Sequence, residues 1–411
     1  MSESAGKLKS GTRLVSIDVL RGIAILAVLC VHMPNDAPGG WRENPWFFAS
    51  YLMRHGYWGV PLFILLSGFC IHRKAAINFK REGVWGLSWK QFWLRRFWRL
   101  YPPYVAAMFV GVFVPWQFGL LTDSDWLGVW HEEHVFADVF THLTMTHNLT
   151  QEYNTGMRNG VYWSLGLEEQ LYALYALLLL ALPRFGWRLV VFTVGLLTLL
   201  WSFSAPHLHP ITLTPGLSVG SFHAWPFMYW LHWVLGALAV SAVVGDRRLP
   251  GWLARPSVFL CLLVPAFVLN GNAFDLLDAR WPWLADYRSI AHSAGMLFVP
   301  LAFFSLILCV VDREDSILMR SAPVELCASI GRISYSLYLV HVPVFLVVRK
   351  FESLEPVGIS WMIRFLIYLS ASLLAGCVFY FLVERRFLNG RLPELGITRF
   401  AKARVKSIGR S

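Results

Sequence analysis

Charged residues are scarce in this chain of 411 residues, since only 15% are Asp, Glu, Lys or Arg while 56% are apolar and 16% are aromatic. A soluble domain of this length needs a charged surface, so the shortage argues against a soluble fold and against a disordered or coiled-coil chain. The mean hydropathy of +0.51 indicates instead a membrane protein with several spanning segments.

Cysteine pairs and several well-known catalytic motifs are also lacking. The six cysteines form no C-x-x-C pair and lie in or beside apolar runs, so we interpret them as buried thiols. The chain has no P-loop, no G-x-G-x-x-G and no G-x-S-x-G elbow, so nucleotide-driven pumping and serine-hydrolase chemistry have no support. The first apolar run carries Asp18 and Arg21 with no cleavage site after it, which predicts a retained helix rather than a signal peptide.

Apolar stretches near membrane-spanning length predict an all-α bundle of about ten transmembrane helices. They cover residues 17–34, 57–72, 100–121, 161–182, 187–203, 225–244, 256–271, 291–311, 330–348 and 361–383. With the N-terminus inside, the inner segments hold 27 Lys and Arg and the outer segments 8, as the positive-inside rule requires. We therefore expect both termini in the cytoplasm, and the net charge of +11 then indicates no nucleic-acid partner.

The pattern predicts a cytoplasmic segment at 1–16, a transmembrane domain at 17–383 and a basic cytoplasmic tail at 384–411 that lies on anionic headgroups. The longest outer segment, 122–160, contains His-Glu-Glu-His at 131–134. This is not H-E-x-x-H and no helix is predicted there to fix the ligands, so we expect no metal site. The absence of an internal repeat disfavours transporter folds built from inverted repeats.

Ionisable residues inside a spanning helix are costly, so each is a candidate functional residue. Asp18 and Arg21 share a helix face and are expected to pair, while His32 lies about 16 Å further toward the outer side. A snorkelling anchor is the alternative for Arg21, and a packing residue is the alternative for His32.

A second group of cations consists of Arg95, Arg96 and Arg99, with Arg73 at the end of the preceding apolar run. Guanidinium groups bind phosphates by bidentate contacts, so this group is a candidate site for an anionic ligand on the cytoplasmic side. The alternative is ordinary positive-inside topology with contacts to lipid headgroups.

Glu168 and Glu169 form the most specific local signal, since adjacent carboxylates in hydrocarbon are very unfavourable unless buried in protein, protonated or paired. A salt bridge to an interior arginine accounts for one of them more easily than for both, because neighbours on a helix point about 100° apart. His341 lies mid-helix beside Pro343, where helix packing is favoured. Glu384 is expected to pair with neighbouring arginines.

In this order along the chain, the motifs resemble acyltransferase family 3, a family of integral-membrane acyltransferases that modify surface carbohydrates. The resemblance covers nearly the whole chain. It rests on R-x10-H at Arg21 and His32, FILLSGFCIHR at 63–73, RRFWRLYPPY at 95–104, YWSLGLEEQLY at 162–172 and SYSLYLVH at 334–341. It implies transfer of an acyl group, expected to be acetyl, from cytoplasmic acyl-CoA to a hydroxyl of a carbohydrate or glycolipid acceptor outside a bacterial inner membrane.

The resemblance also implies roles for particular residues, with no metal. His32 would act as general base on the acceptor hydroxyl, and Glu168 or Glu169 would orient its imidazole. An acyl-histidine intermediate remains an open alternative. The residues expected to bind acyl-CoA are Arg21, Arg73, Arg95, Arg96, Arg99, Ser67 and Gly68. The residues expected to bind the acceptor are Trp163, Ser164, Tyr338 and His341.

Two features depart from the family pattern. Many members have an acidic residue where this chain has Pro61, and many larger members continue into an extracellular esterase-like domain, whereas this chain ends at Ser411. We therefore expect it to complete the transfer alone or with a separate partner protein. The competing hypotheses are a transporter of a sugar, lipid-linked intermediate or anion, and a catalytically silent relative that binds a lipid or a partner. The sequence favours no oligomeric state.

Overall fold

The computed structural model describes residues 13–33, 53–120, 128–214, 216–269, 280–352 and 361–388, and the structural statements below concern these ranges. They contain seven helices long and apolar enough to cross a membrane, or up to eight if one bent pair is a single span. A polytopic, predominantly α-helical membrane protein is thereby confirmed. The count of ten helices and the cytoplasmic termini remain predictions, and residues 1–12 and 389–411 lie outside the described ranges.

Each expected apolar stretch overlaps a helix, because helices satisfy every backbone hydrogen bond within the segment. The helices are α1 (Val15–His32), α3 (Gly59–Glu82), α4 (Trp89–Gln117), α5 (Val135–Leu143), α6 (Trp163–Ser204), α7 (Pro226–Val244), α8 (Pro256–Leu269), α10 (Arg288–Val311), α11 (Ala322–Arg332), α12 (Ser334–Glu352) and α13 (Trp361–Leu382). Helix α8 is apolar, but it is shorter than the seven helices that are long enough to cross a membrane.

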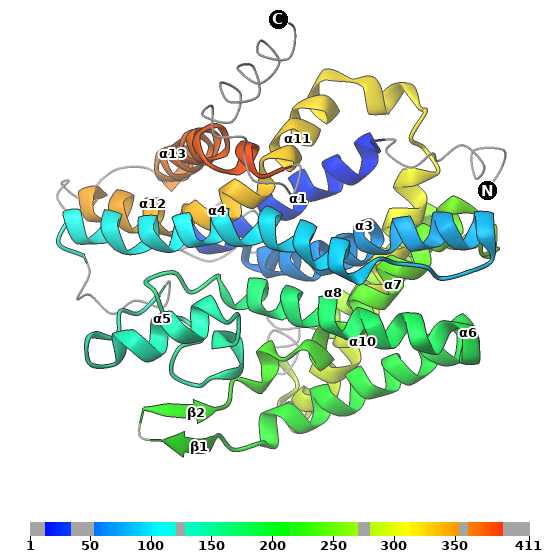
Figure 1. Ribbon diagram of the computed structural model, residues 1–411, viewed down its shortest axis with the longest axis horizontal. Helices are drawn as coiled ribbons and strands as arrows, with labels where there is room; N and C mark the ends of the chain where they lie inside the picture. Colours follow the sequence, from blue (N-terminus) through cyan, green and yellow to red (C-terminus); the bar gives the residue numbers. More distant parts are fainter. Residues whose placement is uncertain are drawn as a thin grey trace, which may run out of the picture.

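Helix α6 consists of two arms that lie side by side in Figure 1. The chain reverses at Gly186, whose φ of 67° and ψ of 169° are not helical and favour glycine. Pro183, just before the reversal, has no N–H to continue the helical hydrogen bonds. The stretches at 161–182 and 187–203, expected as separate helices, thus correspond to the two arms of α6.

Small residues set the closest helix contacts in the core. A Cβ atom on Gly68 of α3 would lie 2.0 Å from the carbonyl oxygen of Trp233 in α7. A Cβ atom on Gly331 of α11 would lie 1.8 Å from the carbonyl oxygen of Asp18 in α1. Glycine at these positions lets the backbones approach closely, as in other membrane helix pairs. These glycines bring α3 close to α7 and α11 close to α1.

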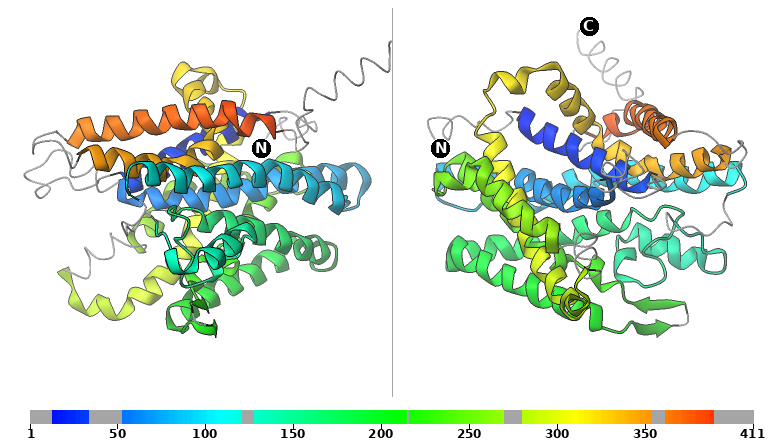
Figure 2. Two further views of the ribbon diagram at one scale, coloured as in Figure 1. Left: turned by 60° about the vertical axis from the view of Figure 1, so that its left-hand side comes forward. Right: turned by 180° about the vertical axis from the view of Figure 1, so that it is seen from behind.

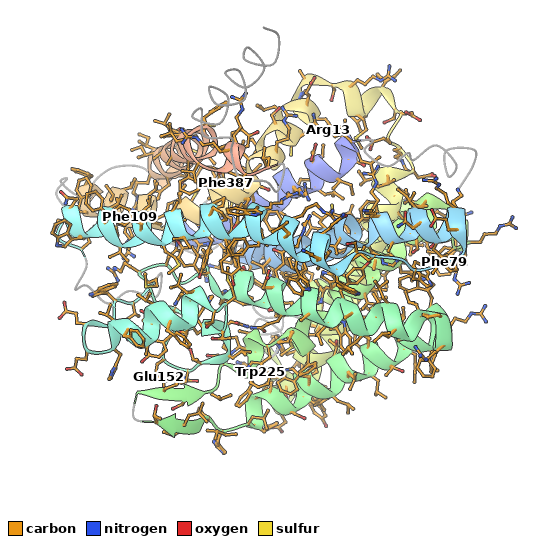
Figure 3. The ribbon with its side chains drawn as sticks, viewed as in Figure 1. Arg13, Phe79, Phe109, Glu152, Trp225 and Phe387 are labelled. Atoms are coloured by element: carbon orange, nitrogen blue, oxygen red, sulfur yellow. The ribbon has the colours of Figure 1, made fainter. Side chains whose placement is uncertain are left out.

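Large apolar side chains cover the outside of the bundle, as expected for surfaces that face lipid. Phe109 of α4 is 66% exposed and lies near the end of that helix in Figure 3. The interpretation of the cysteines as buried holds for Cys309, whereas Cys261 is exposed and the other four are partly buried. A thiol on a lipid-facing helix does not need to be buried in protein. Apolar neighbours in the sequence therefore do not distinguish a thiol buried in protein from one that faces lipid.

The bend between α11 and α12 measures 73° and turns the chain toward the middle of the bundle. The carboxylate of Glu384, which follows α13, accepts hydrogen bonds from the Ser336 amide at 3.1 Å and the Ser336 hydroxyl at 2.5 Å. A carboxylate at this place satisfies a free N–H group of the first turn of α12. The hydrogen bonds of Glu384 are thus made to α12, which corrects the expected pairing with the adjacent arginines.

A small β-hairpin lies outside the bundle and contacts the segment that precedes α6. Strands β1 (Ile211–Thr214) and β2 (Leu217–Val219) pair antiparallel, and Thr150 forms a bridge to Val219. Figure 2 shows this hairpin on the opposite side of the molecule from α13. The hairpin was not expected from the sequence, because two strands this short carry little alternating pattern.

Candidate functional site

A cavity of about 190 Å³ lies among α1, α3, α4, α6 and the bend between α11 and α12. Its charged lining residues are Arg21, Arg96, Arg99, Arg332, Glu168 and Glu384. We call it the arginine cavity. Its four guanidinium groups outnumber its two carboxylates, so the cavity suits an anionic ligand such as a phosphate ester.

Arg21 connects the cavity wall to α3. Its Nη1 lies 3.8 Å from Asp18 Oδ1, which confirms the expected pair, and its Nη2 donates to Cys70 Sγ at 3.3 Å. Asp18 also accepts a hydrogen bond of 2.5 Å from Arg13 Nε. Because Asp18 is shared between two arginines, its charge does not neutralise Arg21 fully, and Arg21 keeps further N–H donors for a ligand.

Glu168 is held within the arginine cavity by two hydroxyl groups. Its Oε1 accepts hydrogen bonds from Ser67 at 2.6 Å and from Tyr172 at 2.5 Å. These two hydrogen bonds satisfy a carboxylate inside the bundle, and the arginines that line the same cavity offset its charge. Ser67, one of the residues expected to bind the donor, therefore lies in the cavity and fixes Glu168.

Three residues expected to bind the donor lie elsewhere. The described lining of the arginine cavity does not include Arg73, Arg95 or Gly68. Arg95 precedes Arg96 on α4 and points about 100° away from it. Gly68 faces Trp233 of α7, so the structure gives this glycine a packing role. Neighbours on a helix face different directions, so these residues lie apart from Arg96, Arg99 and Ser67 although they are close to them in the sequence.

A second cavity of about 360 Å³ lies at the other end of α1. Its polar and aromatic lining residues are His32, Tyr57, Trp58, Trp163, His223, Tyr229, His232, His292 and Tyr338. We call it the histidine cavity. Sequence reasoning did not single out His223, His232 and His292. His232 was recognisable in principle, since it is an ionisable residue within the apolar stretch 225–244.

The geometry around His32 defines its proton-accepting atom. Nδ1 lies 2.8 Å from the carbonyl oxygen of Val28. A carbonyl oxygen only accepts, so this contact assigns the proton of the neutral ring to Nδ1 and leaves a lone pair on Nε2. The backbone of Val28 thus provides the orienting contact that the sequence led us to expect from Glu168 or Glu169. Glu168 instead contacts Ser67 and Tyr172.

His341 packs beside His32 but does not line the histidine cavity in the described residues. The two ring centroids are 5.1 Å apart, and His341 is fully buried. Its Nδ1 lies 2.9 Å from the Tyr338 carbonyl oxygen and 3.2 Å from the Leu337 carbonyl oxygen. His341 therefore supports the wall behind His32, in agreement with the packing interpretation.

The two cavities meet at Tyr338 and Val60, which line both. Tyr338 Oη donates to the Val161 carbonyl oxygen at 2.8 Å and lies 2.5 Å from Ser164 Oγ. Ser164 lines the arginine cavity, while its neighbour Trp163 lines the histidine cavity. The first turn of α6 and the phenol of Tyr338 together form the boundary between an anion-binding cavity and a cavity that holds a potential base.

Comparison with known proteins gives a consistent result. The model of a family described as acyltransferase domain matches residues 14–381. The peptidoglycan O-acetyltransferase OatA of Listeria monocytogenes is 25% identical over 341 residues, covering 80% of this chain and 49% of the relative. The O-acetyltransferase OatA of Staphylococcus aureus is 21% identical over 364 residues, covering 84% of this chain and 53% of the relative.

This chain thus spans about half the length of these curated relatives. No solved structure matches it significantly. The comparisons agree with the resemblance seen in the motifs, and they do not favour the alternative of a transporter.

Proposed function

The chain belongs to acyltransferase family 3, and from that premise we propose that it moves an acetyl group from cytoplasmic acetyl-CoA to a hydroxyl of a surface glycan such as peptidoglycan. The observation that carries the proposal is the pair of cavities that meet at Tyr338 and Val60. One cavity offers arginines to a donor, and the other offers Nε2 of His32 to an acceptor.

In this proposal the arginine cavity receives acyl-CoA. Under the predicted topology the cavity lies toward the cytoplasm, where acyl-CoA is made. Arg21, Arg96 and Arg99 line it and have the fork geometry that binds phosphate oxygens in pairs. From Arg21, the rise of α1 to His32 is about 16 Å. An extended pantetheine arm then carries the thioester from the phosphate contacts toward the boundary at Tyr338.

The acceptor hydroxyl enters the histidine cavity and gives its proton to His32 Nε2. Its oxygen bonds to the thioester carbonyl carbon, and the carbon–sulfur bond breaks as the tetrahedral centre collapses. The CoA thiolate leaves and takes the proton from the imidazolium, so His32 returns to its starting form. A two-step route through acyl-His32 would use the same nitrogen.

Ser164 and Tyr338 bring the hydroxyl groups at the boundary. Tyr338 donates to the Val161 carbonyl oxygen, and we propose that this proton turns to the oxyanion that forms on the thioester oxygen. Glu168 lies on the donor side with Ser67, so we assign this pair to positioning the donor arm. Glu169 is adjacent to Glu168 but does not line the described cavity wall, so we assign it a supporting role in the packing of α6.

The experiment uses wild type and His32→Ala in membranes at equal folded amounts, with radiolabelled acetyl-CoA and a surface-glycan fraction. Loss of a general base is expected to lower transfer by roughly 10²-fold to 10⁴-fold. His209→Ala is the control, because His209 is exposed and lies outside both cavities.

Label in the glycan that is lost only in His32→Ala supports the proposal. Equal label in both proteins removes His32 from the mechanism. If wild type transfers no label and binds no acyl-CoA, the proposal fails and a binding or transport function replaces it.

A further inference from the structure

His232 of α7 is a fully buried imidazole that the mechanism above does not use. Within the part of the chain that the structure describes, neither of its ring nitrogens has a hydrogen-bond partner. His72 shows the usual arrangement for a buried histidine, with Nδ1 3.1 Å from Tyr175 Oη and Nε2 3.2 Å from Ser241 Oγ. Buried polar atoms are normally paired because leaving them unpaired is unfavourable, so His232 is an exception that needs an explanation.

The indole of Trp58 provides a second, independent observation in the same cavity. Its Nε1 is buried and has no acceptor among the described residues, and it comes from the 3₁₀ helix η2 (His55–Trp58) rather than from α7. Both His232 and Trp58 line the histidine cavity together with His32. Two elements of the fold thus contribute residues with unpaired polar atoms to the wall of one cavity.

The remaining lining of the cavity narrows the chemistry of its ligand. Of the described residues that line it, none is Asp, Glu, Lys or Arg, in contrast to the arginine cavity. Aromatic rings lie in the wall, with the Trp163 and Tyr229 centroids 5.8 Å apart. A neutral imidazole donates from one nitrogen and accepts at the other, whereas an indole only donates. This combination matches a sugar, which presents hydroxyls that both donate and accept and flat C–H faces that pack on aromatic rings.

We propose that the histidine cavity binds an uncharged saccharide unit of the acceptor and that His232 positions this unit by hydrogen bonds to a hydroxyl other than the one that reacts. The inference rests on the proposed function and extends it by naming the acceptor subsite. The volume of about 360 Å³ falls within the usual range for small-molecule sites. His232 binds substrate in this account, while His32 carries the proton transfer.

The decisive variant is His232→Leu, which keeps an apolar side chain of similar size and removes both nitrogens. Transfer is measured against the concentration of the surface-glycan fraction at saturating acetyl-CoA, and then against acetyl-CoA at saturating glycan. The glycan KM is expected to rise at least tenfold, while the acetyl-CoA KM stays within about twofold. Because the unpaired nitrogens are gone, the thermal midpoint of unfolding is expected to stay level or to rise.

His232→Asn and His232→Gln show which nitrogen matters, since the amide of Asn lies near the place of Nδ1 and that of Gln near the place of Nε2. One of the two is expected to recover most of the glycan affinity that Leu loses. Trp58→Phe is expected to raise the glycan KM by a smaller factor, because it removes one donor and keeps the ring.

Each outcome decides the inference. A wild type that transfers no label refutes the proposed function, and the inference with it. A wild type that transfers label and a His232→Leu protein with an unchanged glycan KM refute the inference alone. A His232→Leu protein in which both KM values rise together with a lower thermal midpoint indicates a packing role and also refutes it.

Discussion

The phenolic oxygen of Tyr338 lies 2.5 Å from Ser164 Oγ at the boundary of the two cavities. The same phenol donates to the Val161 carbonyl oxygen at 2.8 Å, which fixes the ring. Under the proposed function, a donor in one cavity and an acceptor in the other react at this boundary. The contact between α12 and the start of α6 therefore determines how closely thioester and hydroxyl approach each other.

Tyr338→Phe is expected to lower acetyl transfer by about 10-fold to 100-fold, because it removes a hydroxyl from the reaction boundary and leaves Val161 O and Ser164 Oγ without this partner. The measurement is the initial rate with labelled acetyl-CoA. Tyr104→Phe is the control, since Tyr104 is fully buried but its hydroxyl has no partner among the described residues. Equal rates in both variants would show that the Tyr338 hydroxyl takes no part in the reaction.

Arg99→Ala is expected to raise the KM for acetyl-CoA about tenfold or more, since a charge-assisted contact to phosphate contributes about 1.5–3 kcal/mol. Arg99 lines the arginine cavity and the nearby Arg95 does not, so Arg95→Ala is a control of the same charge change. The glycan KM should stay constant in both. A similar loss in the two variants would show that general positive charge, and not the cavity, binds the donor.

The sequence was sufficient for the all-helical membrane class, for the Asp18–Arg21 pair and for the separation of an arginine-rich end from the His32 end. Those features follow from hydropathy and from helix periodicity along single segments. Contacts between segments far apart in the chain could not be predicted from the sequence. The partner of Glu168 is Ser67, 101 residues away, and the orienting contact of His32 is a backbone carbonyl, which no residue type reveals. His232 was missed because a lone histidine in an apolar helix has no motif around it.

Cys70 offers a chemical test of the donor cavity. Its thiol lines the arginine cavity and accepts a hydrogen bond from Arg21. We expect a small maleimide to modify Cys70 in membranes, and we expect saturating acetyl-CoA, which has no free thiol to consume the maleimide, to slow this modification by at least threefold. Mass spectrometry of the peptide that contains Cys70 measures the rate, and Cys261, which is exposed on α8, is the internal control. Protection of both thiols to the same degree would mean that CoA acts away from the cavity.

Gly68→Ala tests the packing role that the structure gives to this residue. A Cβ atom there would lie 2.0 Å from the Trp233 carbonyl oxygen, so α3 and α7 must separate and the protein is expected to lose about 1–3 kcal/mol of stability. Gly195→Ala is the matched control, since its Cβ would meet only Leu231 at 3.8 Å. Thermal unfolding in detergent compares the two. An unchanged thermal midpoint for Gly68→Ala, together with weaker binding of acetyl-CoA, would show that Gly68 belongs to the donor site instead.

The stacked imidazoles of the outer segment predict a dependence of stability on pH. His147 is fully buried outside the spanning helices, and its ring centroid lies 4.0 Å from that of His142, which contacts Asp138. Burial, and secondly the neighbouring His142, hold the pKa of His147 well below its usual value near 6.5. When the pH falls below about 6.5, the unfolded chain binds a proton at this residue and the folded chain does not, so stability decreases with falling pH.

For one such group the loss between pH 8 and pH 5.5 is about 1.4 kcal/mol, and above pH 7.5 the group contributes little slope. His147→Gln removes the titrating ring, so the difference in unfolding free energy between the two pH values is expected to shrink by about that amount. Hydrogen exchange of residues 138–162 at pH 5.5 and pH 8 is the measurement, because it isolates this segment from the other histidines. An equal pH response in wild type and His147→Gln would show that His147 accepts its proton in the folded protein and that the burial of the pair does not oppose it.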